Sequence, residues 1–187
     1  MEILFVDACP REMSRTRELA KRLLIQLQGN ITTLKLAEAD IPEVTEDVVN
    51  KRFLDGKKGV FTDSVYDLAK QFAGADIIVI AAPYWDMSFP ALLKKYIEAI
   101  TVTGITFRYS ENGAPIGMCR AGKLYYLTTA GGRIISEAFG YEYIKTLAEE
   151  MYGIQECCCF KAENLDIEGA DAEEIMRNAL SMIDEAF

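Results

Sequence analysis

Apolar and polar positions follow two different periods along the chain. Short apolar runs predict β-strands at residues 2–6, 31–36, 77–82, 123–127 and 154–160. Between them, apolar residues recur at spacings of three and four, which predicts helices at 14–28, from 63 onward, and at 89–101, 136–151 and 171–186. Because strands and helices alternate, the pattern indicates an α/β fold with a parallel sheet and right-handed crossovers.

The run from Ile77 to Ala82 is apolar throughout, as is typical of a central strand covered on both faces. Pro83 must end this strand, because proline donates no ladder hydrogen bond. Residues 84–87, Tyr-Trp-Asp-Met, then place two aromatics and a carboxylate at the carboxyl end of the strand, where open α/β sheets bind ligands. For the helix that follows, we expect Ser88 as N-cap and Pro90 in the first turn.

The first predicted strand ends in a loop, residues 7–13, and Ser14 is suited to cap the next helix. With Arg15 and Thr16 in the first turn, hydroxyls, free backbone N–H groups and the positive end of the helix dipole converge. This favours a phosphate site, although a serine N-cap is also a common structural device. The loop matches neither the P-loop nor the dinucleotide glycine fingerprint, which argues against ATP hydrolysis and a conventional Rossmann NAD site.

Three other stretches stand out. Residues 128–132, Thr-Thr-Ala-Gly-Gly, follow the fourth strand, and their glycines allow a ligand to approach the backbone closely, though a plain turn also explains them. Residues 37–61 predict a partly helical excursion with a mobile loop. Residues 104–117 predict a long exposed connection that carries Phe107 and Tyr109, with a turn at Asn112-Gly113.

Composition narrows the function. The 187 residues are consistent with a single domain, and the formal charge of −9 argues against a nucleic-acid partner. With no run of eighteen apolar residues and no secretory signal, we expect no membrane span and a cytoplasmic protein. The chain has no histidine, which excludes histidine-based catalysis and most zinc chemistry, so a bound cofactor is the best candidate for carrying the reaction.

Three of the five cysteines are consecutive, at positions 157–159 in the fifth predicted strand. Strand alternation places Cys157 and Cys159 on one face and Cys158 on the other, so the three cannot surround one metal and we interpret them as small buried hydrophobes. Cys9 stands near a helix N-terminus, a position that suits a redox thiol.

Three segments, in order and at strand ends, resemble the FMN-dependent NADH-azoreductase and NAD(P)H:quinone oxidoreductase family. They are residues 9–16, residues 82–90 (Ala-Pro-Tyr-Trp-Asp-Met-Ser-Phe-Pro) and residues 104–113 (Gly-Ile-Thr-Phe-Arg-Tyr-Ser-Glu-Asn-Gly), with 128–132 as a weaker match. The resemblance covers essentially the whole chain. It implies a flavodoxin-like three-layer sandwich with a five-stranded parallel sheet in the order 2-1-3-4-5, and a homodimer with FMN sites at its interface.

The resemblance also assigns residues. Ser14, Arg15 and Thr16 would hold the FMN phosphate. Cys9 stands where relatives often have serine, which favours a cofactor contact over a redox thiol. Residues 83–87 (Pro83, Tyr84, Trp85, Asp86, Met87) would wrap the isoalloxazine edge, with a backbone N–H at flavin N5. Residues 129–132 (Thr129, Ala130, Gly131, Gly132) would offer N–H groups to the N1 and O2 region. Tyr109, and Phe107 with it, would overhang the flavin of the partner subunit.

Two positions depart from the family. Asp86 replaces a frequent asparagine, and a carboxylate there disfavours anionic reduced flavin unless it turns away or is hydrogen-bonded. Arg133 stands where some relatives have histidine, and we hypothesise that it supplies a cation near N1.

The sequence thus predicts an enzyme that passes hydride from NADH or NADPH through FMN to small aromatic acceptors: quinones, azo compounds or nitroaromatics. One alternative is a flavodoxin-like electron carrier that acts with a protein partner, against which the long 101–117 loop argues. Another is a flavin-free binding module, in which Cys9 and Asp86 mark a decayed site.

Overall fold

The computed structural model describes all residues from 1 to 187, and its centre is a parallel sheet of five strands. These strands are β1 (Glu2–Asp7), β2 (Asn30–Lys35), β3 (Ile77–Ala81), β6 (Lys123–Thr129) and β7 (Glu156–Ala162). They lie in the order β2-β1-β3-β6-β7. Counted along the chain without the two short strands outside this sheet, that is the predicted order 2-1-3-4-5.

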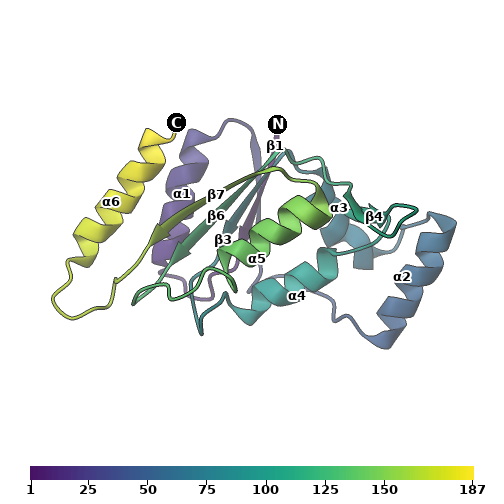
Figure 1. Ribbon diagram of the computed structural model, residues 1–187, viewed down its shortest axis with the longest axis horizontal. Coiled ribbons are helices and arrows are strands. Elements are labelled where there is room, and N and C mark those ends of the chain that lie inside the picture. The colour runs from purple at the N-terminus through teal and green to yellow at the C-terminus, as the bar shows by residue number, and fades with distance from the viewer.

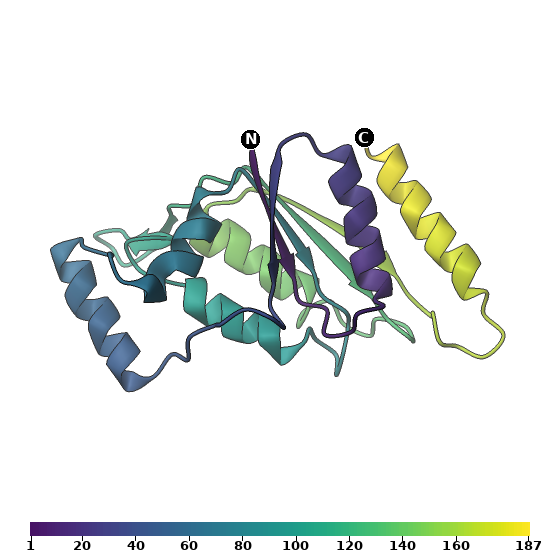
Figure 2. The same ribbon diagram turned by 180° about the vertical axis from the view of Figure 1, so that it is seen from behind.

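Helices cover both faces of the sheet, as Figures 1 and 2 show. One face carries α1 (Arg15–Gln26) and α6 (Ala172–Glu185). The other carries α3 (Asp67–Gly74), α4 (Ala91–Ile100) and α5 (Tyr141–Thr146). Alternation divides the strand residues between the two layers: Leu4 and Val6 pack under α3 and α4, whereas Ile3 and Phe5 pack under α1 and α6.

The same alternation confirms the predicted division of the consecutive cysteines between the two faces, although all three are partly rather than fully buried. Cys157 and Cys159 pack against the cluster that contains α3, α4 and α5, and Cys158 packs against the other cluster. Burial raises the pKa of Cys157 to about 11 and that of Cys159 to about 12, as expected of thiols that serve as packing groups.

Two predicted helix starts are wrong. Ser88 does not cap α4, which begins after Pro90 without a side-chain cap; the Ser88 hydroxyl instead donates to the Phe139 carbonyl. The helix expected from residue 136 begins at Tyr141 and continues as a π-helical turn, Leu147–Tyr152. In both cases the residues before the helix are held in loops beside the carboxyl edge of the sheet.

The polar excursion after β2 contains α2 (Glu46–Lys58), which Thr45 caps at its start and Gly59 at its end. This helix has no buried residue and projects from the body of the molecule (Figure 1). The Arg52 guanidinium ties it to α4 by donating to the carbonyls of Glu98 and Ala99, both at 3.1 Å. A short 3₁₀ turn, Ser64–Tyr66, then leads into α3.

Residues 104–117 form an antiparallel hairpin, β4 (Phe107–Tyr109) with β5 (Pro115–Gly117), and Asn112-Gly113 lies in its turn as predicted. Because it connects the end of α4 to the start of β6, the hairpin lies at the amino edge of the sheet. Tyr109 is exposed, but Phe107 is buried beneath it, which corrects the expectation that both are exposed.

No helix of the structure has both the length and the apolar composition that a membrane span requires.

Gly117 provides a test of how the hairpin docks. A Cβ atom built on Gly117 would lie 2.1 Å from the backbone nitrogen of Gly153 at the end of the π-helical turn. We expect Gly117→Ala to lower the free energy of unfolding by about 2–3 kcal/mol in urea denaturation. Gly122→Ala is the control, because nothing lies within 4 Å of its Cβ position. Equal stability of the two variants would contradict this packing.

Candidate functional site

A cleft of about 380 Å³ opens at the carboxyl edge of the sheet. Four segments that are distant in the sequence form its walls: the loop into α1, the turn after β3, the loop after β6 and the segment after β7. The residues that line it are Pro10, Arg11, Met13, Ser14, Arg15, Thr16, Pro83, Tyr84, Trp85, Thr129, Ala130, Gly131, Leu165 and Asp166. Most of the predicted cofactor residues therefore lie together, as expected for a site at the carboxyl ends of parallel strands.

The start of α1 is open to a ligand. Ser14 is the N-cap, and its hydroxyl accepts a hydrogen bond from the Arg17 N–H at 3.3 Å. The N–H groups of Arg15 and Thr16 have no acceptor within the chain. Together with the helix dipole they create an anion-binding end of the cleft.

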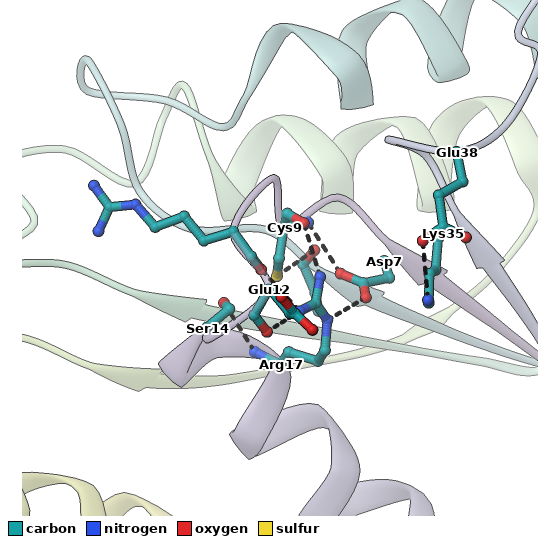
Figure 3. Close-up of polar contacts among 9 residues, drawn as sticks. Asp7, Cys9, Glu12, Ser14, Arg17, Lys35 and Glu38 are labelled. Carbon is teal, nitrogen blue, oxygen red and sulfur yellow. Dashed lines mark hydrogen bonds and ion pairs between the residues drawn. The ribbon is translucent and has the colours of Figure 1, made fainter.

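A buried ion pair shapes the loop before this helix (Figure 3). The Arg17 Nε donates to Asp7 at 2.5 Å, and the Asp7 side chain is only 1% exposed. The same guanidinium donates to the carbonyls of Cys9 and Arg11, each at 2.8 Å, and to that of Glu12. Arg17 thereby satisfies the loop carbonyls as hydrogen-bond acceptors. The groups left without a partner at the start of the helix are therefore N–H donors.

Two hydrogen bonds join the remaining walls. The hydroxyls of Thr16 and Thr129 lie 2.6 Å apart, which couples α1 to the end of β6. The Tyr84 N–H donates to the Thr129 carbonyl at 2.9 Å, which couples the β3 turn to the same strand end. Thr129 thus fixes the spacing between the anion-binding end and the aromatic end of the cleft.

The turn after β3 is tight. Trp85 and Ser88 exchange two backbone hydrogen bonds, at 2.9 and 2.8 Å, around Asp86 and Met87. Both central residues have positive φ, 49° and 65°, a conformation that is uncommon outside glycine. The N–H groups of Asp86 and Met87 have no acceptor, whereas those of Tyr84 and Trp85 do.

Other predicted site residues lie outside the cleft. Asp86, Met87 and Gly132 do not line it, and Arg133 is exposed elsewhere on the loop. Among the predicted donors after β6, the Ala130 N–H is already bonded to the Ala162 carbonyl, whereas the N–H groups of Gly131 and Gly132 are free.

Cys9 also lies apart from the cleft. It is 2% exposed, its thiol donates to the Ala81 carbonyl at 3.6 Å, and burial raises its pKa to about 12. A thiol that stays protonated at neutral pH is unsuited to redox chemistry, so Cys9 packs behind the loop instead.

Sequence reasoning missed the residues that act through tertiary contacts. Arg11 stacks its guanidinium over Trp85, 5.6 Å from the ring centre, at the aromatic rim. Asp166 comes from the segment after β7, where no motif marked it. Asp7 did carry a signal, because a carboxylate directly after an apolar run is unusual inside a sheet.

Comparison with known proteins identifies the family. A family model described as having a flavodoxin-like fold matches residues 1–186. The chain is 36% identical over 192 residues to an FMN-dependent NADH:quinone oxidoreductase 2 of Clostridium acetobutylicum, covering 96% of this chain and 94% of that protein. It is 32% identical over 190 residues to an FMN-dependent NADH:quinone oxidoreductase of Coprothermobacter proteolyticus, with the same coverages.

Solved structures share the fold. An azoreductase from Bacillus anthracis superposes with a TM-score of 0.85 at 23% identity, covering 100% of this chain and 98% of the other. An FMN-dependent NADH-azoreductase from Bacillus anthracis, in complex with FMN, gives a TM-score of 0.82 at 20% identity and coverages of 99% and 96%. The chain belongs to the family of flavodoxin-like fold proteins. Within it, the chain is similar to the FMN-dependent NADH:quinone oxidoreductases.

The Asp7–Arg17 pair can be tested against a matched pair on the same helix. Arg17→Met leaves a buried carboxylate and three carbonyls without their donor, so we expect a loss of about 3 kcal/mol in unfolding free energy, measured in urea. Arg22→Met breaks the pair with Asp184, in which the two side chains are 43% and 36% exposed, and is expected to cost less because water can replace the lost donor. Similar losses in the two variants would show that Arg17 has no special structural role.

Proposed function

We propose that this chain is an FMN-dependent oxidoreductase that takes hydride from NADH or NADPH and passes electrons to quinone, azo or nitroaromatic acceptors. The observation that carries the proposal is the cleft itself, which has hydrogen-bond donors for an anion at one end and aromatic side chains at the other. The chain is also 36% identical to an FMN-dependent NADH:quinone oxidoreductase. FMN has the matching shape, with a phosphate at one end and a flat ring system at the other.

The residues fit such a cofactor. The free N–H groups of Arg15 and Thr16, with the Ser14 hydroxyl, suit a phosphate dianion. Gly131 lines the cleft, and its N–H has no acceptor within the chain, so it is available to a ligand. A side chain at this position would meet the Asp166 carboxylate, since a Cβ there would lie 2.5 Å from Asp166 Oδ2. Pro83, Tyr84 and Trp85 would support the ring.

The bound flavin would supply the redox chemistry, accepting hydride from a nicotinamide and giving electrons to an aromatic acceptor. The chain would orient it. Of the groups predicted to meet the ring, Gly131 lines the cleft with a free N–H that could serve the N1 and O2 region. The N–H groups of Asp86, Met87 and Gly132 are also free, but these residues lie beside the cleft, so they would reach the ring only if it extends past Trp85 and Gly131. These donors would stabilise negative charge on the ring. A cationic contribution from Arg133 remains a hypothesis, which unchanged FMN affinity and flavin potential in Arg133→Ala would contradict.

We further propose a homodimer. The hairpin lies at the edge of the sheet opposite its own cleft, so Tyr109 could overhang a flavin only in a partner subunit. The long 101–117 loop therefore argues against an electron carrier only if it covers the flavin of a partner subunit. Helix α2 supports a dimer as well, because Val49, Phe53 and Leu54 are more than half exposed on it.

The redox proposal is tested by the visible spectrum. We expect the purified protein to bind FMN and turn yellow, to bleach when NADH is added without oxygen, and to recover its colour when a quinone follows. A yellow protein that NADH cannot bleach would favour the electron carrier. A protein that takes up no FMN would favour the flavin-free binding module.

The dimer is tested by sedimentation velocity. Phe53→Asp places a charge on the exposed face of α2 and is expected to convert dimer to monomer. Ile25→Asp is the control, because Ile25 is 73% exposed on α1, away from α2. A wild-type chain that sediments as a monomer would refute the dimer, and a dimer unaffected by Phe53→Asp would remove α2 from the interface.

A further inference from the structure

At the anion-binding end of the cleft, the Arg15 guanidinium already forms an ion pair with the Asp166 carboxylate of the same chain. Arg15 Nη1 donates to Asp166 Oδ1 at 2.8 Å, and both side chains are partly exposed, at 45% and 70%. Both residues line the cleft. A negative charge therefore stands beside the N–H groups that suit a phosphate.

The backbone of Asp166 is firmly placed. Residues 164–166 donate three backbone hydrogen bonds to the loop after β6: Asn164 to Gly132 at 3.0 Å, Leu165 to Ala130 at 3.2 Å and Asp166 to Gly131 at 2.8 Å. The carboxylate also presses against Gly131, where a Cβ would come within 2.5 Å of Asp166 Oδ2. Only the side chain is free to move, by rotating toward solvent.

We infer that Asp166 sets cofactor affinity by competing with the FMN phosphate for the Arg15 guanidinium. The inference rests on the proposed function and assigns to this chain a residue that weakens binding of its own cofactor. A phosphate dianion at the start of α1 attracts Arg15 and repels Asp166. Binding must therefore break or share the ion pair and place two anions close together.

This competition has a selective signature. It acts on the phosphate alone. Riboflavin has the same ring but no phosphate, so its Kd is not expected to depend on Asp166. It acts between exposed charges, so it weakens as salt screens them. Because an exposed ion pair contributes little to folding, Asp166→Asn is expected to leave stability intact. A substitution that tightens binding also cannot be explained by damage to the fold.

The experiment is titration of the flavin-free protein with FMN and with riboflavin, followed by quenching of flavin fluorescence at low and high salt. We expect Asp166→Asn to lower the Kd for FMN about fivefold at low salt, to lose most of this gain at high salt, and to leave the Kd for riboflavin unchanged. Glu168→Gln is the matched control: it removes the same charge from the same loop, and Glu168 neither lines the cleft nor forms an ion pair.

A double-mutant cycle tests the route through Arg15. Arg15→Gln should weaken FMN binding, and in that background Asp166→Asn should give a smaller gain than in the wild-type chain. An Asp166→Asn variant that binds FMN as the wild type does, or more weakly, or that tightens riboflavin equally, would overturn the inference while the proposed function stands. Absence of FMN binding in the wild type would instead refute the proposed function.

Discussion

The pairing of Asp7 with Arg17 is the interaction on which the site depends. Asp7 ends the second strand from the sheet edge and is almost fully buried, so its charge requires a partner inside the protein. Arg17 supplies that partner and uses its other donors on the carbonyls of the intervening loop. One guanidinium thus neutralises a buried carboxylate, folds the loop and aims the start of α1 at the cleft.

The cleft is an assembly of strand ends. In a parallel sheet every carboxyl end reaches the same edge, so loops that are far apart in the chain meet there. Thr129 links two of them through its hydroxyl to Thr16 and its carbonyl to Tyr84. The segment after β7 adds a fourth wall, which is pinned to the loop after β6 by backbone hydrogen bonds. The sheet therefore sets the distance between the polar and aromatic ends of the cleft, and the loops supply the residues that line the cleft.

The same geometry separates the cleft from an exposed apolar surface of the chain. Residues that line the cleft lie at the carboxyl edge, whereas the β4–β5 hairpin and α2 lie toward the amino edge, with apolar groups exposed (Figure 1). In the proposed homodimer, the hairpin of one subunit would meet the cleft of the other. The exposed Tyr109 ring meets the buried Phe107 ring edge to face, with ring centres 5.3 Å apart, so the inner ring supports the outer one.

The sequence by itself determined the fold and most of the cleft. Periodicity located the five strands of the sheet, and the segments after them contained Ser14, Arg15, Thr16, Trp85 and Gly131, because local pattern alone places a loop at the end of a strand. Tertiary structure decided the rest. Ser88 donates to the Phe139 carbonyl instead of capping α4, the buried Cys9 thiol donates to the Ala81 carbonyl, and Asp166 pairs with Arg15 across the cleft. Each of these contacts joins residues that are remote in the chain, and their energies arise only when the sheet brings the segments together.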